Sequence, residues 1–105
     1  MLESEMTDEQ TISWIFLSTA IASEKESADF ASISKIADGI NHAIPTHKEL
    51  QTSLTWLTQN GLIIKTGNKY SLTEKGKLDY KESSNNIGTV LNIWENIEAR
   101  LKRFV

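Results

Sequence analysis

The chain has no cysteine, one proline and no arginine before Arg100 in its 105 residues. The missing cysteine excludes a disulfide framework, a thiolate zinc site and a cysteine nucleophile. No stretch approaches the roughly 20 apolar residues that cross a bilayer. Residues 1–10 are acidic and lack the basic and then apolar pattern of a signal peptide. We therefore expect a cytoplasmic protein that does not insert into a membrane.

Catalytic motifs are missing as well. The sequence contains no G-x-S-x-G elbow, no phosphate-cradling glycine loop and no H-E-x-x-H pair. Its only histidines, His42 and His47, flank Pro45, whereas a metal site needs three or four converging ligands. We expect no enzymatic activity, no metal and no cofactor.

Length and composition indicate one globular domain spanning residues 1–105, because 39% apolar and 24% charged residues are ordinary values for a folded protein. The net charge of -3 is unevenly spread. Residues 1–30 contain seven acids and one lysine, whereas residues 61–105 contain eight bases and five acids. The negative total argues against a polyanionic partner, but the basic residues lie mainly in the C-terminal part of the chain.

The first predicted helix spans residues 7–22. Thr7 and Gln10 have the spacing of a capping box at its start. The helix is apolar on nearly every side, so it must be covered on more than one face. The cover is the C-terminal helix, a partner subunit, or both. Residues 23–29 are polar and charged and predict a loop.

Residues 31–60 predict two helices separated by Pro45. In the first, residues 31–41, the apolar side chains that share one face are Ile33, Ile36, Ala37 and Ile40. The second, residues 46–60, starts at a capping box formed by Thr46 and Glu49. Its apolar face consists of Leu50, Leu54 and Leu57. Gly61 follows as a left-handed C-terminal cap.

Residues 62–72 predict a β-hairpin with strands 62–65 and 69–72. A three-residue loop at 66–68, with Asn68 left-handed, places Leu62, Ile64, Tyr70 and Leu72 on one face. A two-residue turn at Gly67 and Asn68 would instead pair Ile63 with Leu72 and leave Leu62 and Ile64 opposite polar residues. The apolar alternation favours the three-residue loop. In that register Lys65 and Lys69 lie opposite each other.

Another helical turn is predicted after Thr73, and a final helix over residues 84–104 follows a polar break. The apolar residues of the final helix step by three and four, which is the heptad spacing of a coiled-coil seam. They are Ile87, Val90, Trp94, Ile97, Leu101 and Phe104. We expect this seam and the apolar first helix to form one surface.

The pattern over residues 31–80 resembles the winged-helix superfamily, in the form seen in MarR-like and PadR-like bacterial regulators. The matching residues are Ile33, Ile36, Ala37 and Ile40, then Leu50, Leu54, Leu57, Gly61, Leu62 and Ile63, and finally Tyr70, Leu72, Thr73 and Gly76. The resemblance implies a mainly α fold with a small β-hairpin. In that fold a helix-turn-helix at residues 31–60 and a wing at residues 62–72 are flanked by an N-terminal and a long C-terminal helix. The implied function is DNA-binding regulation of transcription.

The resemblance also implies that residues 46–60 form a recognition helix in the major groove of double-stranded DNA. The residues that would contact DNA are Thr46, His47, Lys48, Gln51, Thr52, Thr55 and Gln59 on the helix and Lys65 and Lys69 on the wing. Glutamine can pair with adenine, threonine can meet a thymine methyl group, and lysine can reach phosphate. His47 is alternatively an exposed first-turn residue. A polyanion would relieve repulsion between Lys65 and Lys69, although both can also splay into solvent.

In such regulators the helices outside the helix-turn-helix form the dimerisation end, so the resemblance implies a homodimer. Its interface residues would be Trp14, Leu17, Val90, Trp94, Ile97 and Leu101.

An alternative function is a winged-helix module that binds a protein partner and not DNA. Net acidity favours this alternative. So does the absence of arginine from the predicted recognition helix and wing, because arginine is the commonest guanine-reading side chain. Trp56 lies off the leucine face, and we expect it to pack against a neighbouring helix or to mark an interface, with packing favoured.

Overall fold

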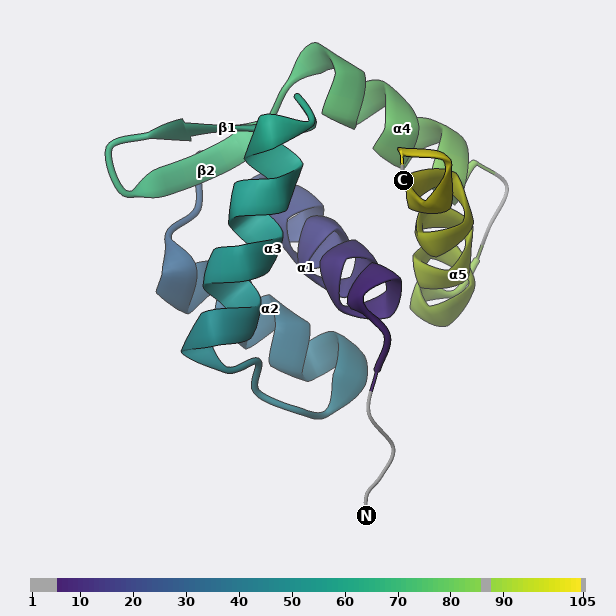
Figure 1. Ribbon diagram of the computed structural model, residues 1–105, viewed down its shortest axis with the longest axis horizontal. Helices are drawn as coiled ribbons and strands as arrows, with labels where there is room; N and C mark the ends of the chain where they lie inside the picture. The colour runs from purple at the N-terminus through teal and green to yellow at the C-terminus, as the bar shows by residue number, and fades with distance from the viewer. Residues whose placement is uncertain (1–5, 86–87, 105) are drawn as a thin grey trace.

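The computed structural model describes residues 6–85 and 88–104 of the chain. They form a mainly helical protein with one antiparallel hairpin (Figure 1). The elements, in order, are α1 (Asp8–Ala22), α2 (Phe30–Asn41), α3 (His47–Gln59), β1 (Ile63–Thr66), β2 (Lys69–Leu72), α4 (Glu74–Ser84), α5 (Val90–Leu101) and a 3-10 turn at Lys102–Phe104. The predicted fold class, mainly α with a small β-hairpin, is confirmed.

Helix α1 is the centre of the molecule. The capping box at its start is present, with the Thr7 hydroxyl accepting from the Gln10 amide at 3.1 Å and the Thr7 amide donating to Gln10 Oε1 at 2.8 Å. Every residue from Ser13 to Ala20 is buried. Helices α2, α3 and α5 pack around it (Figure 1). The apolar surface of α1 is therefore covered within one chain.

The indole N–H groups of two tryptophans in this core are hydrogen-bonded, as burial requires. The Trp14 indole donates to the Ala37 carbonyl at 3.0 Å and so joins α1 to α2. The Trp94 indole donates to the Gln10 carbonyl at 3.1 Å and to Ser13 Oγ at 2.9 Å, which joins α5 to α1. The two indole rings are stacked with centroids 6.2 Å apart. Tryptophan thus fixes two of the helices that surround α1.

The C-terminal region consists of two helices, α4 and α5, where the sequence predicted a helical turn and one long helix at 84–104. Helix α4 is an 11-residue helix, and α5 begins only at Val90, after its N-cap Thr89. The Arg100 guanidinium joins the two helices through Asp79 at 2.9 Å and Glu82 at 2.6 Å. The hydrogen bond from Arg100 to Asp79 is the main reason why the pKa of Arg100 is raised. The heptad spacing therefore describes a helix that packs inside the chain.

Helix α3 begins and ends as the sequence predicts. The Thr46 hydroxyl accepts from the Glu49 amide at 3.0 Å, and the Thr46 amide donates to Glu49 Oε1 at 2.8 Å. Gly61 has a φ of 75°, and the Leu62 amide donates to the Leu57 carbonyl at 3.0 Å. With the bond from the Gly61 amide to the Thr58 carbonyl, this is a Schellman cap. Leu62 is fully buried as the apolar residue of that cap.

The hairpin register differs from the favoured prediction. The paired residues are Ile63 with Leu72, Ile64 with Ser71, Lys65 with Tyr70, and Thr66 with Lys69. Only Gly67 and Asn68 remain for the turn. Gly67 has a φ of 65° and Asn68 is not left-handed, which fits a type II′ turn. The three-residue loop is wrong because Leu62 is buried as part of the cap of α3 and not as part of the hairpin. The buried apolar residue of β1 is Ile63, which pairs with Leu72, whereas Ile64 is exposed. The strand pairing is therefore shifted by one residue from the prediction.

A short bridge connects the hairpin to the segment before α2. The Tyr70 amide donates to the Ala28 carbonyl at 2.7 Å, and the Ala28 amide donates to the Tyr70 carbonyl at 2.8 Å. The rings of Phe30 and Tyr70 stack with centroids 5.9 Å apart. Residues 23–29, predicted as a loop, thus contain one β-bridge that anchors the base of the hairpin.

The junction between the hairpin and α4 requires a glycine. The Thr73 hydroxyl donates to the Gly61 carbonyl at 2.6 Å and accepts from the Gly76 amide at 3.0 Å. A Cβ atom on Gly76 would lie 1.9 Å from the Leu62 carbonyl oxygen. The first turn of α4 therefore packs directly on the backbone that ends α3.

We expect Gly76→Ala to destabilise the fold by about 3 kcal/mol, the upper part of the range for overpacking, because the obstacle is backbone and cannot rotate away. The matched control is Gly39→Ala. Gly39 lies inside α2, where an added Cβ atom would have open space within 4 Å, so this change should stabilise by about 0.5–1 kcal/mol. Urea unfolding of both variants is the measurement. Equal midpoints for the two variants would contradict the close approach.

Candidate nucleic-acid interface

Helix α3 presents a polar ridge on the side opposite its buried leucines. All nine residues predicted to contact DNA are exposed: Thr46, His47, Lys48, Gln51, Thr52, Thr55, Gln59, Lys65 and Lys69. The ridge itself, opposite Leu50, Leu54 and Leu57, consists of Lys48, Thr52, Thr55 and Gln59. The α3 ridge is thus available to a partner along its whole length.

The two sides of α3 face different surroundings. On one side, Gln51, Thr55 and Gln59 border a hollow shared with Lys65 and Tyr70 of the hairpin. On the other side, Lys48 and Thr52 border a groove shared with α1 and α5. The predicted contact residues of α3 therefore do not form a single flat surface.

The two hairpin lysines point in opposite directions. Lys65 shares the inner face with its partner Tyr70, and its Nζ lies 5.9 Å from the centroid of the Tyr70 ring. Lys69 pairs with Thr66 and lies on the outer face. The prediction that the two lysines oppose each other on one face is wrong, and with it the repulsion that a polyanion would relieve. Lys65 instead faces toward α3, where it adds a positive charge beside Gln51.

His47 lies in the first turn of α3 and packs against Phe30. The two ring centroids are 5.4 Å apart. Because Phe30 also stacks on Tyr70, the rings connect the starts of α2 and α3 to the hairpin. The N-terminal end of α3 and the hairpin are therefore held in a fixed relation.

Asp29 places a carboxylate beside this surface. It is the N-cap of α2, with the Ser32 amide donating to Oδ1 at 2.9 Å. Hydrogen bonding to Ser32 lowers the pKa of Asp29, with a smaller contribution from the charge of Lys69. Asp29 and Lys65 line the same hollow of about 390 Å³. The positive charge of the hairpin is thus partly balanced by a side chain with a structural role.

The residues predicted for a dimer interface are mostly internal. Trp14, Leu17, Ile97 and Leu101 are buried in the core of the single chain. Trp94 is half-buried against α1, and Val90 is 41% exposed. Of the same seam, Ile87 and the side chain of Phe104 lie outside what the structure describes. Among the described residues of the seam, Trp94, Ile97 and Leu101 pack inward and Val90 reaches the surface.

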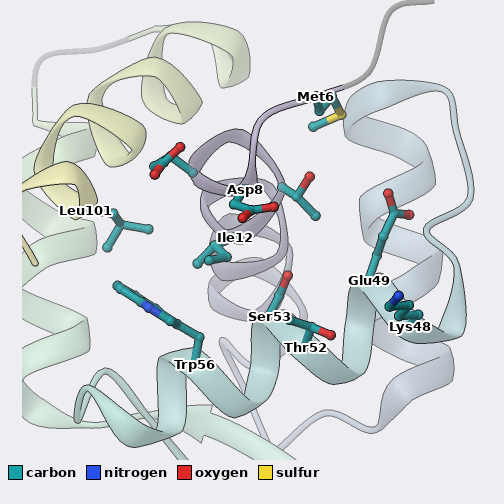
Figure 2. A pocket seen from close by; sticks show the side chains of 11 residues that line it. Met6, Asp8, Ile12, Lys48, Glu49, Thr52, Ser53, Trp56 and Leu101 are labelled. Atoms are coloured by element: carbon teal, nitrogen blue, oxygen red, sulfur yellow. The ribbon is translucent and has the colours of Figure 1, made fainter. Parts of the chain in front are cut away.

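A groove between α1, α3 and α5 was not predicted from the sequence. Its volume is about 390 Å³, and Figure 2 shows Trp56 from α3, Ile12 from α1 and Leu101 from α5 converging at one end. Trp56 is half-buried and forms a wall of this groove. The position of Trp56 off the leucine face was the one sign of this groove in the sequence. The groove itself could not be predicted, because its opposite walls come from segments far away in the chain.

Within the described ranges, no three His, Asp or Glu side chains lie close enough to hold a metal ion. Nor does this part of the chain contain a helix with the length and apolar character needed to cross a membrane. Comparisons with models of protein families, with curated proteins and with solved structures give no match. We therefore infer function from the residues of this chain alone.

The Asp29 cap gives a pH-dependent prediction. Because its folded pKa lies below the ordinary value of 3.8, the carboxylate stabilises the fold above that pH, and this contribution is lost as the pH falls through the folded pKa. Asp29→Asn keeps a capping side chain and removes the titration. The urea midpoint of the wild type relative to Asp29→Asn should be constant above about pH 5 and fall below about pH 4. A difference that does not change with pH would contradict this role.

Proposed function

We propose that the chain is a winged helix-turn-helix protein that binds double-stranded DNA, with the role of a transcriptional regulator. The order of elements supports the fold. Helix α1 is followed by the isolated β-bridge at Ala28, then by α2 and α3, and then by the β1–β2 hairpin. In this proposal α2 and α3 are the helix-turn-helix and β1–β2 is the wing.

Full exposure of the α3 ridge beside a lysine-bearing hairpin is the single observation that carries the DNA proposal. The diameter of an α-helix suits the major groove of B-DNA. The hairpin leaves the body beside the C-terminal end of α3 and projects away from α4 and α5 (Figure 1). Lys48 on α3, Lys65 and Lys69 can then reach phosphates. Gln51 and the ridge residues Thr52, Thr55 and Gln59 can meet base edges.

The side chains on α3 and the hairpin determine which DNA bases the protein can contact. No arginine precedes Arg100, so bidentate arginine contacts to guanine are not available to α3 or the hairpin. Gln51, Thr52 and Thr55 favour A·T-rich sites, through adenine edges and thymine methyl groups. We therefore propose moderate affinity that depends strongly on salt.

Binding to a mixed-sequence duplex, measured by fluorescence anisotropy from low to physiological salt, tests this proposal. Three lysine–phosphate contacts predict a slope of about −3 for the logarithm of the association constant against that of the salt concentration. The double reversal Lys65→Glu and Lys69→Glu should reduce the magnitude of the slope by about 2 and weaken low-salt binding at least about tenfold.

The matched control is Lys102→Glu with Arg103→Glu. It makes the same change in net charge at the exposed 3-10 turn after α5, and it should leave most of the affinity and the slope intact. No retention of duplex by the wild type at low salt would contradict DNA binding. Equal losses in both double variants would show that only net charge matters.

A homodimer remains part of the proposal. Because Trp14, Leu17, Ile97 and Leu101 are internal, the interface must use outer residues. Val90 and Leu91 are 41% and 59% exposed at the start of α5, and they are the large apolar residues of that helix that a second copy can cover.

Sedimentation should show a species of twice 11.8 kDa at tens of micromolar, and Leu91→Lys should shift it to the monomer. A wild type that is monomeric throughout would contradict dimerisation.

Protein binding is the second candidate function. The net charge of -3 favours it, since phosphate contacts need positive charge. In that case the α3 ridge would meet a protein surface, and the anisotropy titration would give no duplex binding at any salt concentration.

A further inference from the structure

The groove between α1, α3 and α5 has the properties of a small-ligand site. Its volume of about 390 Å³ lies within the range of sites that hold small organic molecules. It is too small for a peptide helix, which would exceed this volume within a few turns. Ile12, Trp56, Leu101 and Met6 provide apolar walls and floor. The occupant is therefore a compact molecule with an apolar body.

The carboxylates around the groove favour a ligand with a positive charge. Among the residues that the structure describes, Asp8 and Glu9 from α1 and Glu49 from α3 line it, and Lys48 is the one base. Glu49 is engaged by the Thr46 amide. Asp8 and Glu9 have no ion pair among residues 6–85 and 88–104, and Figure 2 places Asp8 beside Ile12 above the groove floor. Two carboxylates thus adjoin an apolar wall that contains an indole ring.

We propose that this groove binds an organic cation with a flat aromatic body. The aromatic body lies against Trp56 and Ile12, where the indole face attracts both an apolar ring and a positive charge. The ammonium group lies toward Asp8 and Glu9, which replace part of its hydration. Lys48 and Thr52 of the α3 ridge also line this groove. The test below uses the protein without DNA, so its outcome does not depend on DNA binding.

Three ligands with the same ring system and different charge test the proposal on the full-length chain. They are 1-naphthylmethylammonium, the neutral 1-naphthylmethanol and the anionic 1-naphthylacetate. The indole N–H resonances of the nitrogen-15-labelled protein report the binding. The Trp56 resonance should shift and saturate. The Trp14 resonance should change little, because its indole is buried and hydrogen-bonded to Ala37. The cation should bind about fivefold more tightly than the alcohol, as two partly exposed charge contacts allow, and the acetate should bind most weakly.

The double variant Asp8→Asn and Glu9→Gln keeps the shape of the groove and removes these two carboxylates. It should bind the cation and the alcohol with equal affinity. Glu24→Gln with Glu26→Gln makes the same charge change at exposed positions beyond the other end of α1 and should keep the fivefold preference. Circular dichroism checks that both double variants fold. If Asp8→Asn with Glu9→Gln does not fold, Glu9→Gln alone replaces it and should show a preference for the cation between those of the wild type and no preference.

Four results would overturn the proposal. They are no saturable shift of Trp56 with any ligand at millimolar concentration, equal affinity of the wild type for cation and alcohol, tightest binding of the acetate, and a preference that survives Asp8→Asn with Glu9→Gln.

Discussion

The continuous burial of α1 is the constraint on which the rest of the molecule depends. A helix whose residues from Ser13 to Ala20 are all buried cannot be stable until other elements surround it. Each of its large apolar side chains contributes about 1.5–3 kcal/mol when it leaves water. Its hydroxyl groups are buried at low cost because Ser18 and Thr19 donate to carbonyls one turn earlier, at 2.7 and 2.8 Å. The core therefore needs α2, α3 and α5 together.

This constraint also decides which surface is left for function. Helix α3 uses Leu50, Leu54 and Leu57 to pack inward, so its polar ridge must point outward. The Schellman cap at Gly61 and the close approach of Gly76 to Leu62 then fix where the hairpin leaves the body. Lys65 and the α3 ridge come together because of this junction and the Ala28–Tyr70 bridge. The candidate interface is thus a consequence of packing, whatever its partner.

Local signals in the sequence predict local structure well. The two capping boxes, the leucine face of α3 and the Gly61 cap each depend on residues a few positions apart, and all are present. The hairpin register failed because Leu62 satisfied two patterns, the helix cap and the strand alternation, and only the three-dimensional structure shows which one applies. The heptad spacing of the last helix likewise does not show whether that helix packs against α1 or against a second copy of the chain. The groove beside Trp56 could not be predicted, since its walls lie more than 40 residues apart in the chain, from Ile12 to Trp56 to Leu101.

We propose that the exposed side of α3 and the adjoining hairpin form the surface that meets a nucleic acid. Mapping amide chemical shifts while a DNA duplex is added at low salt tests this claim most directly. We predict that changes concentrate in residues 46–59 and 63–69 and that α4 stays unperturbed. Changes centred on α4 or α5, or none on α3, would contradict it.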